Sequence, residues 1–206
     1  MKTNSERLAA RLPPLTPARL FNPSVHVARQ ASPTLYSGTV RIRDAESDEA
    51  LGWISKHEFE DVPVVTTTTN IDEKVIVEFN DTTPDSAFGL HIIGDDVSLK
   101  WIGVVGVDFP MTNASVSSVL RTYPVPAGSP AQPQTFPSGF YTHVESHIWT
   151  FDLPKRELTA TWVNSDYSSV PLYFYVAKDA NLLFVANVAQ APYPRLTRVY
   201  IFLDQL

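Results

Sequence analysis

The chain concentrates ionisable and aromatic side chains in one short stretch, residues 140–151. Alternate side chains of a β-strand lie on opposite faces, so a strand here would gather two imidazoles, a carboxylate and aromatic rings on one face. The residues of interest on that face are Tyr141, His143, Glu145, His147 and Trp149. Neutral imidazole both donates and accepts hydrogen bonds, and an indole ring offers a flat apolar wall. The pattern predicts a cavity for a small planar organic ligand, with Trp53 and Trp162 as further contributors.

Two other interpretations of this stretch stay open. A metal site is the first, but in a strand His143 and His147 would lie about 13 Å apart, so a metal would need ligands from a neighbouring strand. A purely structural role is the second, because a histidine on a strand often belongs to a satisfied interior or a polar outer face. The four tryptophans are likewise typical of a protein core. The sequence therefore favours a ligand pocket without a metal and without catalytic residues.

Composition excludes several classes of protein. The formal net charge of −6 and the absence of basic runs disfavour binding to nucleic acid or to an anionic membrane surface. The chain contains no cysteine, which excludes disulfides, zinc–thiolate sites and thiol nucleophiles. No stretch of about 18 consecutive apolar residues is present, so no transmembrane helix is expected. The sequence also has no G-x-S-x-G, H-E-x-x-H or phosphate-binding loop that would indicate an enzyme.

The predicted organisation is a proline-rich N-terminal arm, residues 1–33, followed by a single β domain, residues 34–206. Residues 4–11 are expected to form two helical turns, and the rest of the arm is expected to be flexible or packed through Leu15, Leu20, Phe21 and Val25. Residues 124–139 hold five prolines and are predicted to be a long loop. The expected strands are 35–43, 51–56, 62–69, 73–79, 87–93, 97–109, 117–123, 140–151, 157–163, 170–177, 182–188 and 196–203.

This many short strands, separated by turn residues, predict an all-β fold. Antiparallel pairing follows from the short connections, because parallel strands need long crossovers. The favoured architecture is an antiparallel β-sandwich, and a β-barrel is the alternative.

Four segments of the chain resemble small secreted proteins of mushroom-forming fungi. The segments are Glu6–Pro17 (ERLAARLPPLTP), Tyr36–Lys56 (YSGTVRIRDAESDEALGWISK), Tyr123–Gln132 (YPVPAGSPAQ) and Val144–Tyr167 (VESHIWTFDLPKRELTATWVNSDY). Three positions depart from the family's pattern: Arg11 and Tyr167 stand where glycine is usual, and His147 stands where a small residue is frequent. The family has no general assigned activity, so the resemblance implies secretion and an all-β fold more than chemistry. His147 on the ligand-facing side suggests a specialised member of the chromoprotein type.

Secretion is also favoured by two glycosylation sequons, which begin at Asn80 and Asn113. The natural protein is therefore expected to be secreted, with a signal peptide that lies outside this chain. A homodimer is a further expectation, because exposed strand edges and a long arm offer surfaces for pairing.

Two function classes follow. The first is non-enzymatic binding of a pigment-like or chromophore-like small organic molecule, which would be the bound cofactor. The second is a secreted carbohydrate-binding or carbohydrate-active protein, which would show exposed aromatic rings and paired carboxylates.

Overall fold

The computed structural model of the protein describes residues 3–12, 33–59, 62–81, 86–94, 98–106, 108, 115–177, 181–189 and 193–205. The chain divides into two compact units, residues 1–32 and 33–206. In the first unit, α1 (Asn4–Ala9) begins with a capping box. The Thr3 hydroxyl accepts from the Glu6 N–H, and the Glu6 carboxylate accepts from the Thr3 N–H at 2.8 Å, so two unpaired helix-terminal donors are satisfied. The expectations for residues 13–32, including the apolar contacts of Leu15, Leu20, Phe21 and Val25, fall outside the described residues.

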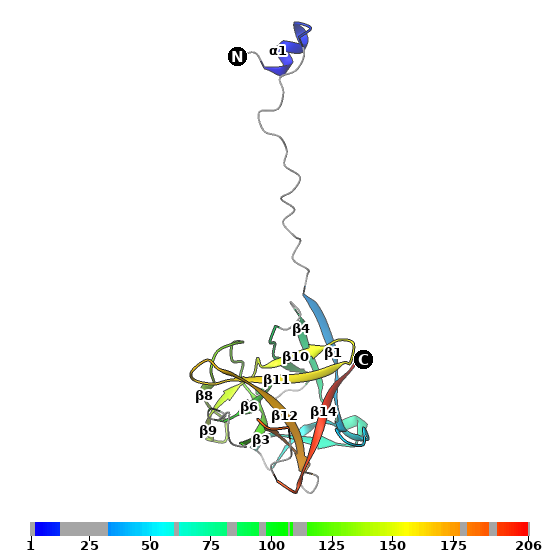
Figure 1. The fold of residues 1–206 in the computed structure, drawn as a ribbon, viewed down its shortest axis with the longest axis vertical. Coiled ribbons are helices and arrows are strands. Elements are labelled where there is room, and N and C mark those ends of the chain that lie inside the picture. The colour runs from blue at the N-terminus through cyan, green and yellow to red at the C-terminus, as the bar shows by residue number, and fades with distance from the viewer. Residues whose placement is uncertain are drawn as a thin grey trace. The chain divides into compact units, whose positions relative to one another are not determined.

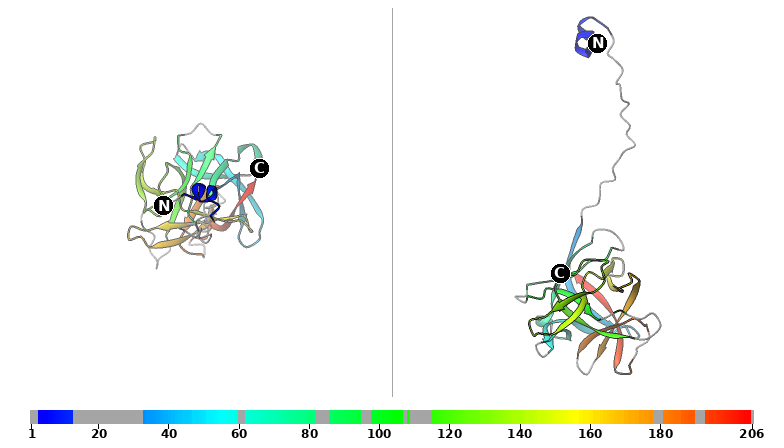
Figure 2. Two further views of the ribbon diagram at one scale, coloured as in Figure 1. Left: turned by 90° about the horizontal axis from the view of Figure 1, so that it is seen from above. Right: turned by 90° about the vertical axis from the view of Figure 1, so that its left-hand side faces the viewer.

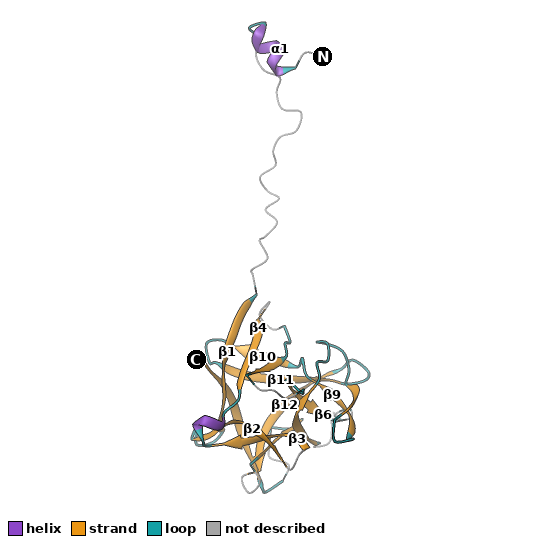
Figure 3. Ribbon diagram, turned by 180° about the vertical axis from the view of Figure 1, so that it is seen from behind, coloured by secondary structure: helices purple, strands orange, loops and turns teal. Residues whose placement is uncertain are grey.

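The second unit is built of strands with one short 3₁₀ turn, η1 (Ile71–Glu73), which lies beside β2 (Figure 3). The strands are β1 (Thr34–Asp44), β2 (Ala50–Phe59), β3 (Val62–Thr68), β4 (Ile76–Asp81), β5 (Leu90–Ile93), β6 (Trp101–Val105), β7 (Val116–Thr122), β8 (Gln132–Thr135), β9 (Tyr141–Glu145), β10 (Trp149–Asp152), β11 (Glu157–Val163), β12 (Ser169–Ala177), β13 (Leu182–Ala186) and β14 (Leu196–Gln205).

These strands join one antiparallel sheet that closes on itself, so the predicted all-β antiparallel fold is confirmed. The barrel, which was the alternative architecture, is the one observed: ten strands close the barrel. Closure depends on β1, which pairs with β14 along one edge and with β4 and then β2 along the other. Figure 1 shows β1 beside the C-terminal β14, and Figure 2 gives two further views of the closed sheet. A sandwich would have two separate sheets, whereas here backbone pairing continues around the ring.

Alternating apolar residues from opposite sides of the ring fill its interior. Val40 and Ile42 of β1, Val77 of β4, Leu90 of β5 and Ile201 of β14 are all fully buried. Each of these residues is followed or preceded by one that faces outward, as a half-buried antiparallel strand requires. The interior that these described strands enclose is therefore a packed hydrophobic core.

Several predicted strands begin or end at other residues than expected; the strand expected at 97–109, for example, is β6 (Trp101–Val105). Two predictions near the stretch of chemical interest are wrong in kind. The expected single strand 140–151 is interrupted at residues 146–148, because β9 pairs with β6 and β8 whereas β10 pairs with β11. The chain turns a corner between them, so the simple alternation of faces ends at Glu145. The expected loop 124–139 contains β8, whose Pro133 is tolerated because β8 lies at the edge of the sheet.

The seam between β1 and β14 yields a test of closure. A Cβ at Gly38 would lie 2.3 Å from the backbone carbonyl oxygen of Asp204, so Gly38→Ala must push the two strands apart. We expect Gly38→Ala to lower the free energy of unfolding by about 1–3 kcal/mol, measured by urea denaturation. Gly94→Asn is the control, because Gly94 has φ +73° and open space around it, and Asn tolerates this conformation. Equal stability of both variants would contradict the close approach at the seam.

Candidate functional site

The residues predicted to share one cavity are dispersed by the corner between β9 and β10. Tyr141 is 60% exposed and meets the half-buried His143 edge-on, with ring centroids 6.0 Å apart. Trp149 is fully buried, donates its indole N–H to the Ile102 carbonyl oxygen at 2.8 Å and stacks on Phe174 at 5.4 Å. Trp149 is therefore a core residue and offers no wall to a ligand.

The other two tryptophans of the predicted set lie elsewhere. Trp162 is fully buried in the main hydrophobic core. Trp53 is half-buried on β2, with the Lys74 ammonium 5.8 Å from its ring centroid. The described part of the chain forms three pockets of about 280 to 410 Å³, and of the seven predicted residues His147 alone lines one of them.

Glu145 is an interior carboxyl, only 1% exposed. The Val163 N–H donates to its two oxygens at 3.0 and 3.1 Å. Burial, and secondarily the negative charge of Asp108, raises the pKa of Glu145 to about 8, although hydrogen bonds from the Val163 and Ala131 backbone oppose the rise. Glu145 is therefore protonated at neutral pH and links β9 to β11 as a structural hydrogen-bonding group.

The strongest constellation is a row of side chains across adjacent strands that ends at His147. Glu78 on β4 lies opposite His91 on β5, and His91 lies opposite Trp101 on β6. A Glu78 carboxylate oxygen is 3.0 Å from Nδ1 of His91. Ring centroids are 4.9 Å apart between His91 and Trp101 and 4.8 Å apart between Trp101 and His147. These four residues line a pocket of about 340 Å³, which we call the His147 pocket.

Gly89 forms the floor of the His147 pocket. A Cβ there would lie 2.6 Å from the Trp101 ring and 2.9 Å from Cε1 of His147, so only glycine lets both rings rest against the backbone. The adjoining Phe88 exchanges backbone hydrogen bonds with Trp149, at 2.9 and 3.1 Å. This bridge holds the corner that carries His147 against the segment that carries Gly89.

Each of the two imidazoles contacts a protein oxygen through its Nδ1 atom. A carboxylate only accepts hydrogen bonds, so the Glu78 contact places the proton of a neutral His91 on Nδ1 and leaves Nε2 as an acceptor. The Ser146 hydroxyl lies 3.3 Å from Nδ1 of His147, which again leaves Nε2 for a ligand. Burial lowers the pKa of His147, against an opposing hydrogen bond with the Val125 backbone, so its ring is neutral at neutral pH.

The other end of the His147 pocket is apolar. Phe79 and Phe88 stack with ring centroids 4.1 Å apart and nearly parallel planes, and Leu35 lies at 60% exposure on the pocket wall. Asn80 is the exposed polar group on this side. A ligand would therefore meet aromatic and aliphatic surface with a few hydrogen-bonding atoms.

Sequence reasoning missed Glu78, His91 and Trp101. Glu78 and His91 are outward residues between apolar neighbours of a strand, and such residues usually belong to a solvated face, whereas a tryptophan such as Trp101 is typical of a core. Their proximity depends on the register of three strands, which no local spacing records. The one usable signal was His147, which the sequence pattern had already placed on the predicted ligand-facing side.

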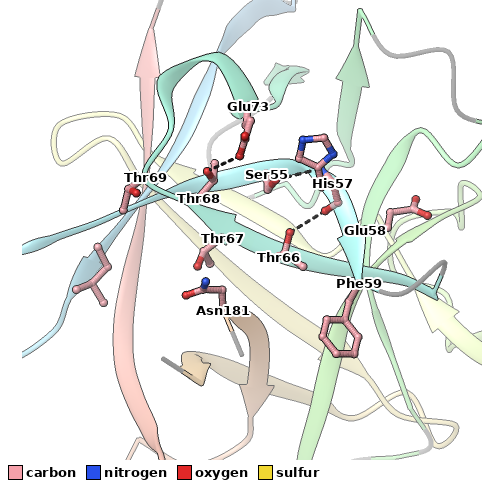
Figure 4. A pocket seen from close by; sticks show the side chains of 11 residues that line it. Ser55, His57, Glu58, Phe59, Thr66, Thr67, Thr68, Thr69, Glu73 and Asn181 are labelled. Carbon is pink, nitrogen blue, oxygen red and sulfur yellow. Dashed lines mark hydrogen bonds between the residues drawn. The ribbon is translucent and has the colours of Figure 1, made fainter. Parts of the chain in front are cut away.

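A second pocket, of about 410 Å³, lies where β2 bulges away from β3 (Figure 4). The register of the two strands shifts between Ile54 and Glu58, and the buried Arg121 guanidinium binds the Lys56 carbonyl oxygen in the bulge. The walls are polar: Thr68 donates to the Glu73 carboxylate at 2.9 Å, and Thr66 donates to the His57 carbonyl oxygen at 2.7 Å. The hydrogen bond from Thr68, with a second one from Asn70, lowers the pKa of Glu73 and keeps it ionised.

No group of three or more His, Asp or Glu residues with metal-binding geometry occurs in the part of the chain that the structure describes. Among the same residues, no helix is long and apolar enough to cross a bilayer. Comparison of the chain with protein-family models, curated proteins and solved structures found no match. The resemblance to secreted mushroom proteins, secretion itself and the homodimer therefore stay predictions.

Glu145 predicts a pH dependence of stability. Its pKa is about 8 in the folded protein and about 4.3 in an unfolded chain, so the folded state binds more protons between these values. Stability then falls as pH rises through this window, by at most about 1.4 kcal/mol per pH unit. Glu145→Gln keeps an acceptor for Val163 but does not ionise, so urea denaturation from pH 5 to 8 should show a shallower decline for this variant. The exposed Glu46→Gln is the control, and parallel pH profiles for wild type and Glu145→Gln would contradict a buried neutral carboxyl.

Proposed function

We propose that the protein is a non-enzymatic binder of a small, largely planar organic molecule of the pigment or chromophore type, held in the His147 pocket. The observation that carries the proposal is the aromatic row His91–Trp101–His147, whose neighbouring rings lie 4.9 and 4.8 Å apart. Ring pairs at this separation attract one another, and a flat ligand adds to the same kind of contact.

The chemistry of the pocket defines the ligand further. With Nδ1–H of a neutral His91 directed at Glu78, Nε2 of His91 accepts a hydrogen bond, so the ligand should carry an N–H or O–H on its rim. The stacked Phe79 and Phe88 favour an apolar body on the opposite side. Pockets for small molecules usually combine an apolar lining with a few placed polar groups, and the volume of about 340 Å³ lies at the lower end of their range.

The pocket predicts selective binding of a planar donor. We expect 2-naphthol to bind more tightly than 2-methoxynaphthalene, which has the same rings but no donor, as measured by quenching of tryptophan fluorescence or by calorimetry. Trp101→Ala and His147→Ala should each weaken 2-naphthol binding at least tenfold, about 1.4 kcal/mol. His143→Ala is the matched control, because His143 lies on β9 outside the pocket.

Folding of each variant is checked by its urea denaturation midpoint. Folded Trp101→Ala and His147→Ala variants that bind 2-naphthol normally would refute the site. Mass spectrometry of small molecules extracted from protein purified from its natural source then identifies the ligand. A colourless protein from that source without an extractable aromatic compound would count against the proposal.

Carbohydrate binding is the second candidate, and the polar pocket at the β2 bulge favours it. Thr67, Thr69 and Asn181 line this pocket together with the ionised Glu73 (Figure 4). Hydroxyl, amide and carboxylate groups of this kind form hydrogen bonds with the hydroxyls of a sugar.

If this pocket binds sugars, a glycan array or calorimetry with neutral mono- and disaccharides should detect them, and the variant Thr67→Val with Asn181→Ala should lose most of the affinity. Thr159→Val, on the far strand β11, is the control. Calorimetry with sugars and with 2-naphthol together ranks the two functions. Sugar binding without 2-naphthol binding would favour the carbohydrate function.

A further inference from the structure

Three strands of the barrel wall part from one another at one place. β11 pairs with β14 through Glu157 and Leu158, and then with β12 from Ala160 onward. The pairing between β12 and β14 begins at Phe174 opposite Val199 and continues to Ala177 opposite Leu196. Figure 1 shows β11 lying across the other two strands. We call this place the fork.

A pocket of about 280 Å³ opens at the fork. Its base is formed by core residues whose side chains face the interior: Leu158, Ala160, Leu172 and Phe174 are each at most 5% exposed. In an unbroken sheet the backbone ladder would cover such residues. The gap therefore gives a small molecule access to apolar atoms that the rest of the wall conceals.

Arg198 stands at one end of the pocket between two aromatic rings. Its guanidinium carbon is 5.0 Å from the Tyr173 ring centroid and 5.5 Å from that of Tyr200. Such contacts hold the guanidinium plane in place and leave its N–H donors available at the edge. Within the described residues, no carboxylate lies at ion-pair distance from Arg198, whereas Arg41 and Arg43 pair with Asp204 and Asp48, each at 3.1 Å.

The opposite end of the pocket carries a negative charge. Glu157 lies opposite Phe202 on β14, four residues from Arg198, so the two groups are roughly 13 Å apart along the strand. An anion is attracted to the Arg198 end and repelled from the Glu157 end. This polarity orients a ligand with its charge at Arg198 and its apolar body over the base.

We propose that the fork is a second binding site, for a small aromatic monocarboxylate. The carboxylate forms a bidentate pair with Arg198, and the aromatic body covers the apolar base between β11 and β12. Arg–carboxylate pairs of this geometry are among the stronger charge-assisted hydrogen bonds in proteins. The site is separate from the His147 pocket, with which it has no lining residue in common.

The test measures how 2-naphthoate and its neutral isostere 2-naphthamide bind to the full-length protein. Calorimetry gives the affinities, and NMR chemical-shift changes locate the binding site. We expect 2-naphthoate to bind at least tenfold more tightly than 2-naphthamide, with an affinity that falls as salt rises. The two ligands are compared in the Trp101→Ala variant, so that the His147 pocket does not contribute. Arg198→Gln should weaken 2-naphthoate binding at least tenfold. Arg43→Gln is the matched control, because Arg43 is also a strand residue near an aromatic ring, 5.9 Å from Phe202, but lines none of the three pockets.

Two more variants make the result decisive. Thr159→Trp should abolish binding by filling the mouth of the pocket from an exposed position, even if Arg198→Gln fails to fold. Trp101→Ala, in the His147 pocket, should leave 2-naphthoate binding unchanged. Equal binding of the acid and the amide, or equal losses in Arg198→Gln and Arg43→Gln, would overturn the proposal.

Discussion

Backbone pairing between the first and last strands of the barrel is the constraint on which the rest of the structure depends. β1 and β14 pair continuously from Gly38 opposite Gln205 to Asp44 opposite Val199. This ladder removes two sheet edges that would otherwise leave N–H and C=O groups unpaired. Closure also turns apolar side chains from all sides toward one another, and in the described strands they form a buried hydrophobic core.

The three pockets each arise from a departure from regular pairing. The pocket at β2 and β3 lies at a register shift, the fork lies where β11 changes partner, and the His147 pocket lies beside the corner between β9 and β10. Bulges and partner changes redirect side chains and expose apolar atoms that a regular ladder covers. In this protein the three pockets therefore coincide with irregularities of the sheet.

Buried polar groups stabilise these irregularities. Arg121 binds carbonyl oxygen in the β2 bulge, Glu145 accepts from the Val163 N–H, and the Ser146 hydroxyl accepts from the Val125 N–H at 2.7 Å. Each satisfies backbone groups that regular pairing would otherwise have satisfied, and an unpaired buried backbone group costs about 1–3 kcal/mol. Glu145, which the sequence pattern assigned to a ligand site, therefore stabilises the fold.

The sequence by itself determined the all-β class and most strand positions, because alternation and turn residues are local signals. It also singled out His147. Tertiary structure alone decided between barrel and sandwich, since that choice depends on whether β14 pairs with β1, about 160 residues away. It alone placed Trp149 in the core and brought Glu78, His91 and Trp101 to His147. Cross-strand neighbours are set by register, and register is a property of the closed sheet that no single segment contains.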